Sequence, residues 1–340
     1  MKSKRKDYIT LMSVISAFSV VLLHSNGCFW IFSKSRYWFI SNIIDALFFF
    51  AVPLFSMITG ITLIGYRDKY STKEYLKKRF NKTVIPYLFF SVFGIIYLLL
   101  NNVISLDSIN FKYIFNGLFS DPPMSLYWFF RELFKVYLCI PLFASVNKNK
   151  RKVEFSYLVL VGVILNYLIP FIINVFKIDV SFGINVPVSS GFLIYVLIGY
   201  LLDNYKIDKK KKIVIHILGI IGLLMHIIGT YVLSMEANEI VRTFKGYTNI
   251  PCLLYSISIF IIIKDLSIYI KNYDIINRLS KYTFSIYLIH IYVMDIIKNL
   301  FNLDYTRLSY IFIMPFFVIP LCILITYILR KIPILRKIVP

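Results

Sequence analysis

Long apolar runs recur along the whole 340-residue chain, and they constrain its fold more than any other feature. Ten runs approach the length that an α-helix needs to cross a bilayer, about 20 residues. They cover residues of roughly 8–29, 40–66, 84–104, 125–146, 153–175, 187–203, 213–234, 249–270, 282–301 and 308–329. Inside lipid a chain must satisfy its own backbone hydrogen bonds, so these runs are expected to be helices. The sequence therefore predicts an all-α integral membrane protein, a bundle of about ten transmembrane helices.

The composition leaves little room for a soluble part. Apolar residues make up 59% of the chain and charged residues 16%, whereas soluble domains carry about 25% charged residues. The connections between the runs are too short to hold a soluble domain. We therefore expect residues 1–340 to form a single membrane domain. The first run is followed by no convincing small-residue cleavage site, so we interpret it as an uncleaved first helix.

The net charge of +21 lies in the short connections rather than on one exposed face. A nucleic-acid surface needs its basic residues gathered on one exposed face, so we expect the lipid bilayer and no nucleic acid as a partner. The two termini and every second connection, which lie on one side of the membrane, together hold 28 basic residues. The connections on the other side hold 7. Cytoplasmic loops retain positive charge, so this asymmetry predicts a multi-pass protein of the cell (plasma) membrane with both termini in the cytoplasm.

Several kinds of site are not indicated by the sequence. The four cysteines are scattered, and no two histidines have the spacing of metal ligands. There is also no glycine-rich phosphate loop and no Gly-x-Ser-x-Gly motif. We therefore predict no metal, and any chemistry must use polar side chains within the bundle or at its ends.

Ionisable residues inside a membrane are costly, which makes them functional candidates. His24 lies sixteen residues beyond Tyr8, about 24 Å along a helix at 1.5 Å per residue, in the outer half. Asp45 lies early in the second run, and the neighbouring residues Arg131 and Glu132 lie early in the fourth. Both runs lead inward, so we expect these three residues at a depth similar to that of His24. His24 can act as a general base, and the Arg131–Glu132 pair can bind an anion or orient the base. An interfacial histidine and a structural ion pair are the alternative interpretations.

Four features are less specific. Lys135 lies one turn after Glu132 and is expected to neutralise it or another carboxylate. Asp45 lies near a helix end, where hydration alone explains a carboxylate. His290 is expected near the midplane, where a hydrogen-bonded buried histidine is the ordinary interpretation. The basic connection after the second run contains Lys77, Lys78, Arg79 and Lys82. It is suited either to anionic lipid or to a phosphate-bearing cofactor such as coenzyme A.

Six segments match a known family in order and spacing. They read VVLLHSN, AVPLFSMITG, YLKKRFNKTVIPY, LYWFFRELFKVYLCIP, FLIYVLIGYLL and LSKYTFSIYLIH. Each segment alone is mostly apolar, but their succession is fairly specific. Over nearly its whole length, the chain resembles the multi-pass membrane acyltransferases of the acyltransferase-3 type.

This resemblance implies about ten helices and an O-acyltransferase activity. Such enzymes move an acyl group, often acetyl, from cytoplasmic acyl-coenzyme A to a sugar, a polysaccharide, peptidoglycan or another extracytoplasmic acceptor of the bacterial cell envelope. It implies that His24 is the base and that Arg131 and Glu132 form an Arg–acidic pair that follows Trp128. It also implies that Arg79, with Lys78 and Lys82, binds the acyl donor, which is acetyl-coenzyme A or another acyl-coenzyme A. Asp45, Trp128 and His290 are implied as further site residues.

The chain departs from the family pattern in its first helix. Many members carry an arginine eleven residues before the histidine and an aspartate three before that arginine; Ser13 and Thr10 stand there in this chain. A second hypothesis therefore stays open: a non-catalytic relative that transports a small polar metabolite or flips a lipid-linked sugar. The intramembrane charges suit such a path equally well.

Overall fold

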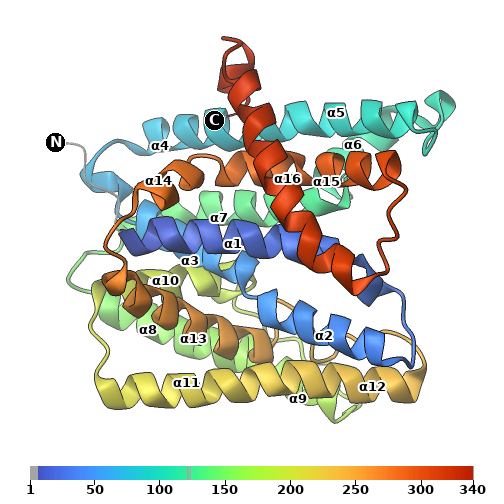
Figure 1. Ribbon diagram of the computed structural model, residues 1–340. Helices are drawn as coiled ribbons and strands as arrows, with labels where there is room; N and C mark the ends of the chain where they lie inside the picture. Colours follow the sequence, from blue (N-terminus) through green and yellow to red (C-terminus); the bar gives the residue numbers. More distant parts are fainter. Residues whose placement is uncertain (1–6, 121, 123, 340) are drawn as a thin grey trace. The chain divides into compact units, whose positions relative to one another are not determined.

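The computed structural model describes residues 7–120, 122 and 124–339 of the protein. All regular secondary structure in these residues is helical (Figure 1). The prediction of an all-α membrane protein is therefore confirmed. The basic residues ahead of Asp7, which contribute to the charge asymmetry, lie outside the described residues.

The helices belong to two compact units. Unit 1 comprises Met1–Leu63 and Val146–Ile325, and unit 2 comprises Ile64–Ser145 and Thr326–Pro340. Unit 1 contains α1 (Asp7–Ser25), α2 (Arg36–Phe48), α3 (Ala51–Leu63), α8 (Arg151–Gly162), α9 (Ile169–Val175), α10 (Phe192–Asn204), α11 (Lys209–Leu224), α12 (Thr230–Ala237), α13 (Ile250–Leu266), α14 (Asp274–Ser280), α15 (Thr283–Leu300) and most of α16 (Leu308–Leu329). Unit 2 contains α4 (Thr72–Arg79), α5 (Ile85–Leu100), α6 (Phe111–Phe119) and α7 (Trp128–Ser145). The single membrane domain stays a prediction.

Each of the ten predicted runs contains a helix. Among the described residues, seven segments are long and apolar enough to cross a membrane: Asp7–Ser25, Arg36–Asp68, Thr72–Leu100, Arg151–Val175, Lys209–Ala237, Ile250–Tyr269 and Leu308–Leu329. The other three predicted runs correspond to α7, α10 and α15. Helix α10 has 13 residues, and charged side chains interrupt the apolar sequences of α7 and α15.

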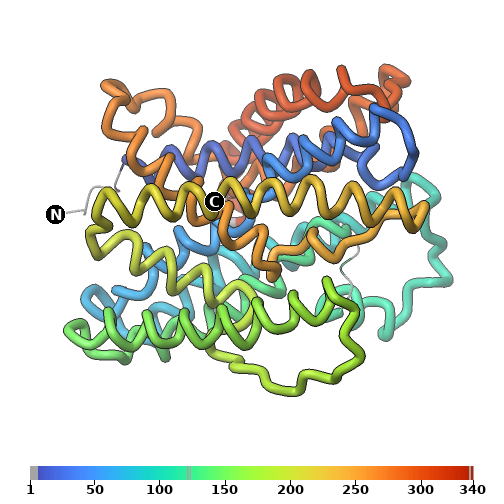
Figure 2. Tube along the Cα trace, turned by 90° about the horizontal axis from the view of Figure 1, so that it is seen from below, coloured from blue at the N-terminus to red at the C-terminus, as the bar shows by residue number. Residues whose placement is uncertain are grey.

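Several of the long segments are not regular α-helices. Helices α2 and α3 are separated at Phe49 and Phe50, because the ring nitrogen of Pro53 cannot donate to the carbonyl one turn earlier. Three other segments contain a π-helical turn, at Phe80–Val84, Val163–Leu168 and Met225–Gly229. These turns join α4 to α5, α8 to α9 and α11 to α12 without ending the helix. Figure 2 shows α11 and α12 as one continuous rod.

Glycines bring two pairs of helices in unit 1 into close contact. A Cβ atom on Gly60 of α3 would overlap the backbone carbonyl of Val196 in α10, and one on Gly199 would overlap the backbone of Met57. Between α11 and α13, a Cβ atom on Gly222 would lie 2.6 Å from the carbonyl oxygen of Pro251. Small residues at such positions let helix backbones approach within a membrane.

Helix α1 is the element around which unit 1 packs, since it contacts α2, α3, α13, α14 and α15. Most of its side chains are buried. Hydroxyls on it donate to carbonyls one turn earlier, as Ser19 does to Ile15 at 2.9 Å and Ser25 to Val21 at 2.9 Å. These polar groups are therefore satisfied inside the helix itself, and the end of α1 is fixed from several sides.

Candidate active site

His24 lies in the last turn of α1, two residues beyond Leu22, which belongs to a small apolar cluster. Leu22, Cys28, Ile44 and Ile311 form this cluster, and Phe18, Tyr37, Phe48 and Leu308 pack against it. It joins the end of α1 to α2 and to the start of α16. Because these side chains come from three helices, His24 has little freedom to move along the axis of α1.

The imidazole of His24 faces that of His290 from α15. His290 Nε2 lies 3.0 Å from His24 Nδ1, and the ring centroids are 4.9 Å apart. His290 is completely buried. Its Nδ1 lies 2.8 Å from the carbonyl oxygen of Ile286 and 2.9 Å from that of Tyr287. The two histidines, which are far apart in the sequence, therefore form one hydrogen-bonded pair.

The hydrogen-bond partners determine which nitrogens carry protons in the neutral pair. Carbonyl oxygens only accept, so His290 Nδ1 must carry a proton and His290 Nε2 is then an acceptor. His24 Nδ1 faces this acceptor and also lies 3.0 Å from the carbonyl oxygen of Val20. Its Nδ1 must therefore carry a proton too. The remaining nitrogen, His24 Nε2, is left with the free lone pair that a general base needs.

A pocket of about 180 Å³ opens beside His24. Its lining comes from the end of α1, from α15, from the connection that follows α15 and from the start of α16, and includes Asp295, Lys298, Tyr305 and Tyr310. Asp295 and Lys298 form an ion pair at 3.0 Å. The candidate base thus borders a space that is lined by hydroxyl, carboxylate and ammonium groups.

A second buried polar centre in unit 1 contains Asp45. Its carboxylate forms an ion pair with Lys245 from the connection between α12 and α13, and the two side chains are 6% and 1% exposed. The Lys245 ammonium also lies over the rings of Phe29 and Phe49, 4.4 and 4.2 Å from their centroids. Burial lowers the pKa of Lys245, and the facing Asp45 carboxylate opposes that shift. Hydration, our simple interpretation of Asp45, is therefore wrong, because the carboxylate is buried against a counter-ion.

Arg131 and Glu132 lie in the first turn of α7 in unit 2, after the half-buried Trp128. Glu132 forms an ion pair with Lys135 at 2.7 Å, which confirms the expected neutralisation. The Nε of Arg131 is buried and has no hydrogen-bond partner in the described part of the chain. The ion pair found for Glu132 among the described residues is with Lys135 and not with Arg131, and the buried Nε–H of Arg131 stays available as a donor.

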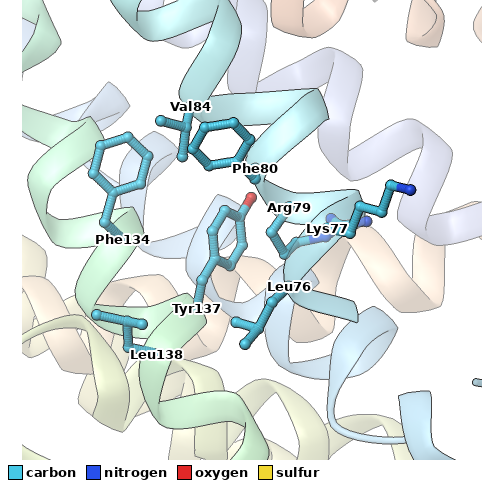
Figure 3. Close-up of a pocket in the computed structure, with 8 residues that line it drawn as sticks. All are labelled: Leu76, Lys77, Arg79, Phe80, Val84, Phe134, Tyr137 and Leu138. Atoms are coloured by element: carbon cyan, nitrogen blue, oxygen red, sulfur yellow. The ribbon is translucent and has the colours of Figure 1, made fainter. Parts of the chain in front are cut away.

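Arg79 borders an apolar pocket of about 460 Å³ in unit 2, between α4, the following π turn and α7. Figure 3 shows Tyr137 at the centre, with Phe134 and Val84 on one side and Arg79 on the other. The Arg79 guanidinium lies 5.6 Å from the ring centroid of Tyr137. Its Nε is buried without a hydrogen-bond partner among the described residues. The arrangement combines an apolar space with an unsatisfied cationic donor, which fits an anionic group attached to an apolar chain.

The other expected donor residues differ from Arg79. Lys78 forms an ion pair with Glu74 at 2.7 Å and lies over the ring of Tyr70 at 3.8 Å, while Lys82 is exposed. Ser13, at the family's arginine position, is buried and donates to the carbonyl oxygen of Ile9 at 2.8 Å. Arg79 is therefore the member of the basic cluster whose setting fits an anionic ligand best.

Sequence reasoning found some of these groups and missed others. It selected His24 and His290 separately but did not pair them, because only packing brings α1 beside α15. It counted Lys245 solely as a loop charge. The signal that could have found the pair was Asp45, a lone intramembrane carboxylate that needs a counter-ion. The residues described contain no cluster of three or more His, Cys, Asp or Glu that could hold a metal.

These features define a multi-pass helical membrane protein with a hydrogen-bonded histidine pair next to a pocket that also contains a carboxylate and an ammonium group. The family described as an acyltransferase domain, acyltransferase-3, matches residues 6–327. The chain therefore belongs to the acyltransferase-3 family of membrane acyltransferases, as its motifs suggested. Comparisons with curated proteins and with solved structures give no match.

Proposed function

We propose that this protein is an O-acyltransferase that moves an acyl group, most simply acetyl, from acyl-coenzyme A to a hydroxyl of an extracytoplasmic acceptor. The acceptor is an envelope polysaccharide or a lipid-linked sugar. The single observation that carries the proposal is the His24–His290 pair, because its hydrogen bonds leave His24 Nε2 free to accept a proton. Family membership supplies the reaction class.

In the proposed step, His24 Nε2 removes the proton of the acceptor hydroxyl. The hydroxyl oxygen attacks the carbonyl carbon of the thioester at the same time. A C–O bond forms and the C–S bond breaks. The coenzyme A thiolate leaves and takes up the proton that His24 has held, so the protein ends the cycle unchanged. His290 is a positioning residue, because its Nε2 accepts a hydrogen bond from His24 Nδ1–H and stabilises the His24 imidazolium that forms.

The remaining roles follow the family resemblance and the charge pattern. Arg131 and Glu132 are retained as site residues on the family resemblance, and a donor would reach the bundle from the cytoplasmic, basic side. Arg79 would then contact a coenzyme A phosphate. The count of 28 against 7 basic residues supports a plasma-membrane protein with both termini inside.

The test uses the full chain in nanodiscs with acetyl-coenzyme A and measures coenzyme A release and acyl transfer. His24→Ala should lower the rate about 10²- to 10⁴-fold, the usual contribution of a general base. His216 of α11, bonded to Ser258 at 2.9 Å, supplies the matched control, and His216→Ala should keep the wild-type rate. Thermal unfolding of each variant checks that it is folded.

The positioning role of His290 has its own readout. His290→Leu removes the acceptor for His24 Nδ1, which should lower the rate about tenfold and shift the pH–rate profile, and His290→Asn should restore both in part. A normal rate in His24→Ala would overturn the proposal. So would uptake or flipping of a solute by a wild-type chain that releases no coenzyme A, which is the behaviour of a transporter.

A further inference from the structure

Three adjoining pockets follow the connection between α15 and α16 in unit 1, starting at His24. The first is the pocket beside His24, and it shares Tyr310 with a second of about 290 Å³. The second shares Arg307 with a third of about 260 Å³. Figure 1 shows this connection passing the end of α1 before α16 begins. The three pockets therefore form a row, joined by shared lining residues and here named the α15–α16 groove, whose first member borders the candidate base.

The charges that line the groove are compensated. Asp295 pairs with Lys298 in the first pocket at 3.0 Å, and Asp304 pairs with Arg307 at 3.3 Å. The hydroxyl and backbone N–H of Thr306 bond to Asp304 and lower the pKa of its carboxyl group. The groove therefore offers hydrogen-bond donors and acceptors in similar number without a net charge.

Tyrosine rings form the apolar part of the lining. Tyr305 lies against Gly27, where a Cβ atom would be 3.4 Å from its ring, and Lys298 Nζ lies 5.7 Å from its centroid. Tyr310 lines both the first and the second pocket, and Tyr37 lines the third. Each tyrosine combines an apolar face with a polar hydroxyl.

This lining selects among possible ligands. Coenzyme A carries several negative charges and would need unpaired cations, which the paired lysine and arginine do not supply. The described residues contain no strand, so a peptide could not be bound here by strand addition, which is one of the recurring modes of peptide recognition. A carbohydrate chain presents many hydroxyls, which need mixed donors and acceptors, and apolar ring faces, which suit tyrosine. The combined volume falls within the range of about 300–1,000 Å³ typical of ligand sites.

We propose that the α15–α16 groove is the acceptor site and that it binds a carbohydrate chain of about three units, one in each pocket. This inference rests on the proposed acyltransferase function. The terminal unit lies in the first pocket with a hydroxyl towards His24, and Tyr305 holds its ring. Arg307 and Asp304 bind the units that follow. The acceptor is consequently a chain rather than a single sugar.

The test measures acetyl transfer in nanodiscs to glucose and N-acetylglucosamine oligomers of one to four units. For the preferred sugar, kcat/KM should rise up to three units and then level off. Tyr305→Ala should lower kcat/KM for the trimer about tenfold, as expected when an aromatic anchor is truncated, and Tyr305→Phe should retain most of it. Arg307→Gln should reduce the trimer value far more than the monomer value, because a single unit does not reach the second pocket.

Tyr269, an exposed tyrosine outside the groove, provides the matched control: Tyr269→Ala should behave as wild type with every oligomer. Equal kcat/KM for monomer and trimer, or an unchanged value in Tyr305→Ala, would overturn the groove. The proposal would also be overturned if the protein released coenzyme A but acetylated none of the oligomers, or if it acetylated a serine-containing peptide faster than any oligomer. Failure of the proposed function itself is distinct, since the wild-type chain would then release no coenzyme A under any condition.

Discussion

The buried Asp45–Lys245 pair makes a quantitative prediction about stability. Replacing Lys245 with methionine removes the counter-ion but keeps much of the side-chain volume, so Asp45 remains as a nearly inaccessible charge without a partner. Breaking a buried ion pair in this way costs about 3–5 kcal/mol. The lost contacts of the ammonium with Phe29 and Phe49 add to that cost. In a folding unit of this size, each kcal/mol lowers Tm by about 2–4 °C, so a decrease of about 6–20 °C is expected.

Thermal unfolding of the full chain in one detergent, followed by intrinsic fluorescence, measures the effect. Lys211→Met is the control, since Lys211 pairs with Asp208 on an exposed surface and such pairs contribute about 0–1 kcal/mol. The double variant Asp45→Leu/Lys245→Met should recover most of the loss, because a neutral, well-packed pair needs no compensation. The reasoning would be refuted by a Lys245→Met protein as stable as Lys211→Met, or by a double variant less stable than the single one.

Two further predictions concern other parts of the chain. Gly60→Ala should lower the free energy of unfolding by about 1–3 kcal/mol through overpacking against α10, whereas Gly183→Ala, in open space, should not. Chemical denaturation in detergent measures both variants, and equal stabilities would contradict the close contact between α3 and α10. Arg79→Ala should lower kcat/KM for acetyl-coenzyme A about tenfold or more, while Lys73→Ala on the same helix should change it little. Acetyl-pantetheine lacks the phosphates, so an equal loss with this donor would show that Arg79 does not act on a phosphate.

The existence and approximate bounds of the helices could be predicted because they follow from local composition. An apolar run in a membrane must be helical whatever surrounds it, so α1 and α16 end close to their predicted residues. The break between α2 and α3 was missed, although Pro53 signals it, because the apolar run continues without interruption across Phe49 and Phe50. The π turns leave no mark in the apolar pattern and could not be predicted.

The candidate site was less predictable, because its geometry depends on packing between distant segments. His24 and His290 are each visible as polar residues in apolar helices, but nothing local determines that their rings meet. Tyr305 and Arg307 gave no signal at all in the sequence, since a short connection with one tyrosine and one arginine is ordinary. Their relation to His24 depends on α15 and α16 turning back beside the end of α1.

The π turn at Met225–Gly229 has a consequence for how the long α11–α12 rod relates to its neighbours. Such a turn takes up one residue more than an α-helical turn, which amounts to a rotation of about 100° around the axis. The face of α11 that packs on α13 and the face of α12 that packs on α2 are therefore set out of phase by a single residue. Deleting one residue inside this turn would remove the offset and rotate one end of the rod by about 100° relative to the other, which would turn one of the two packing faces away from its partner helix.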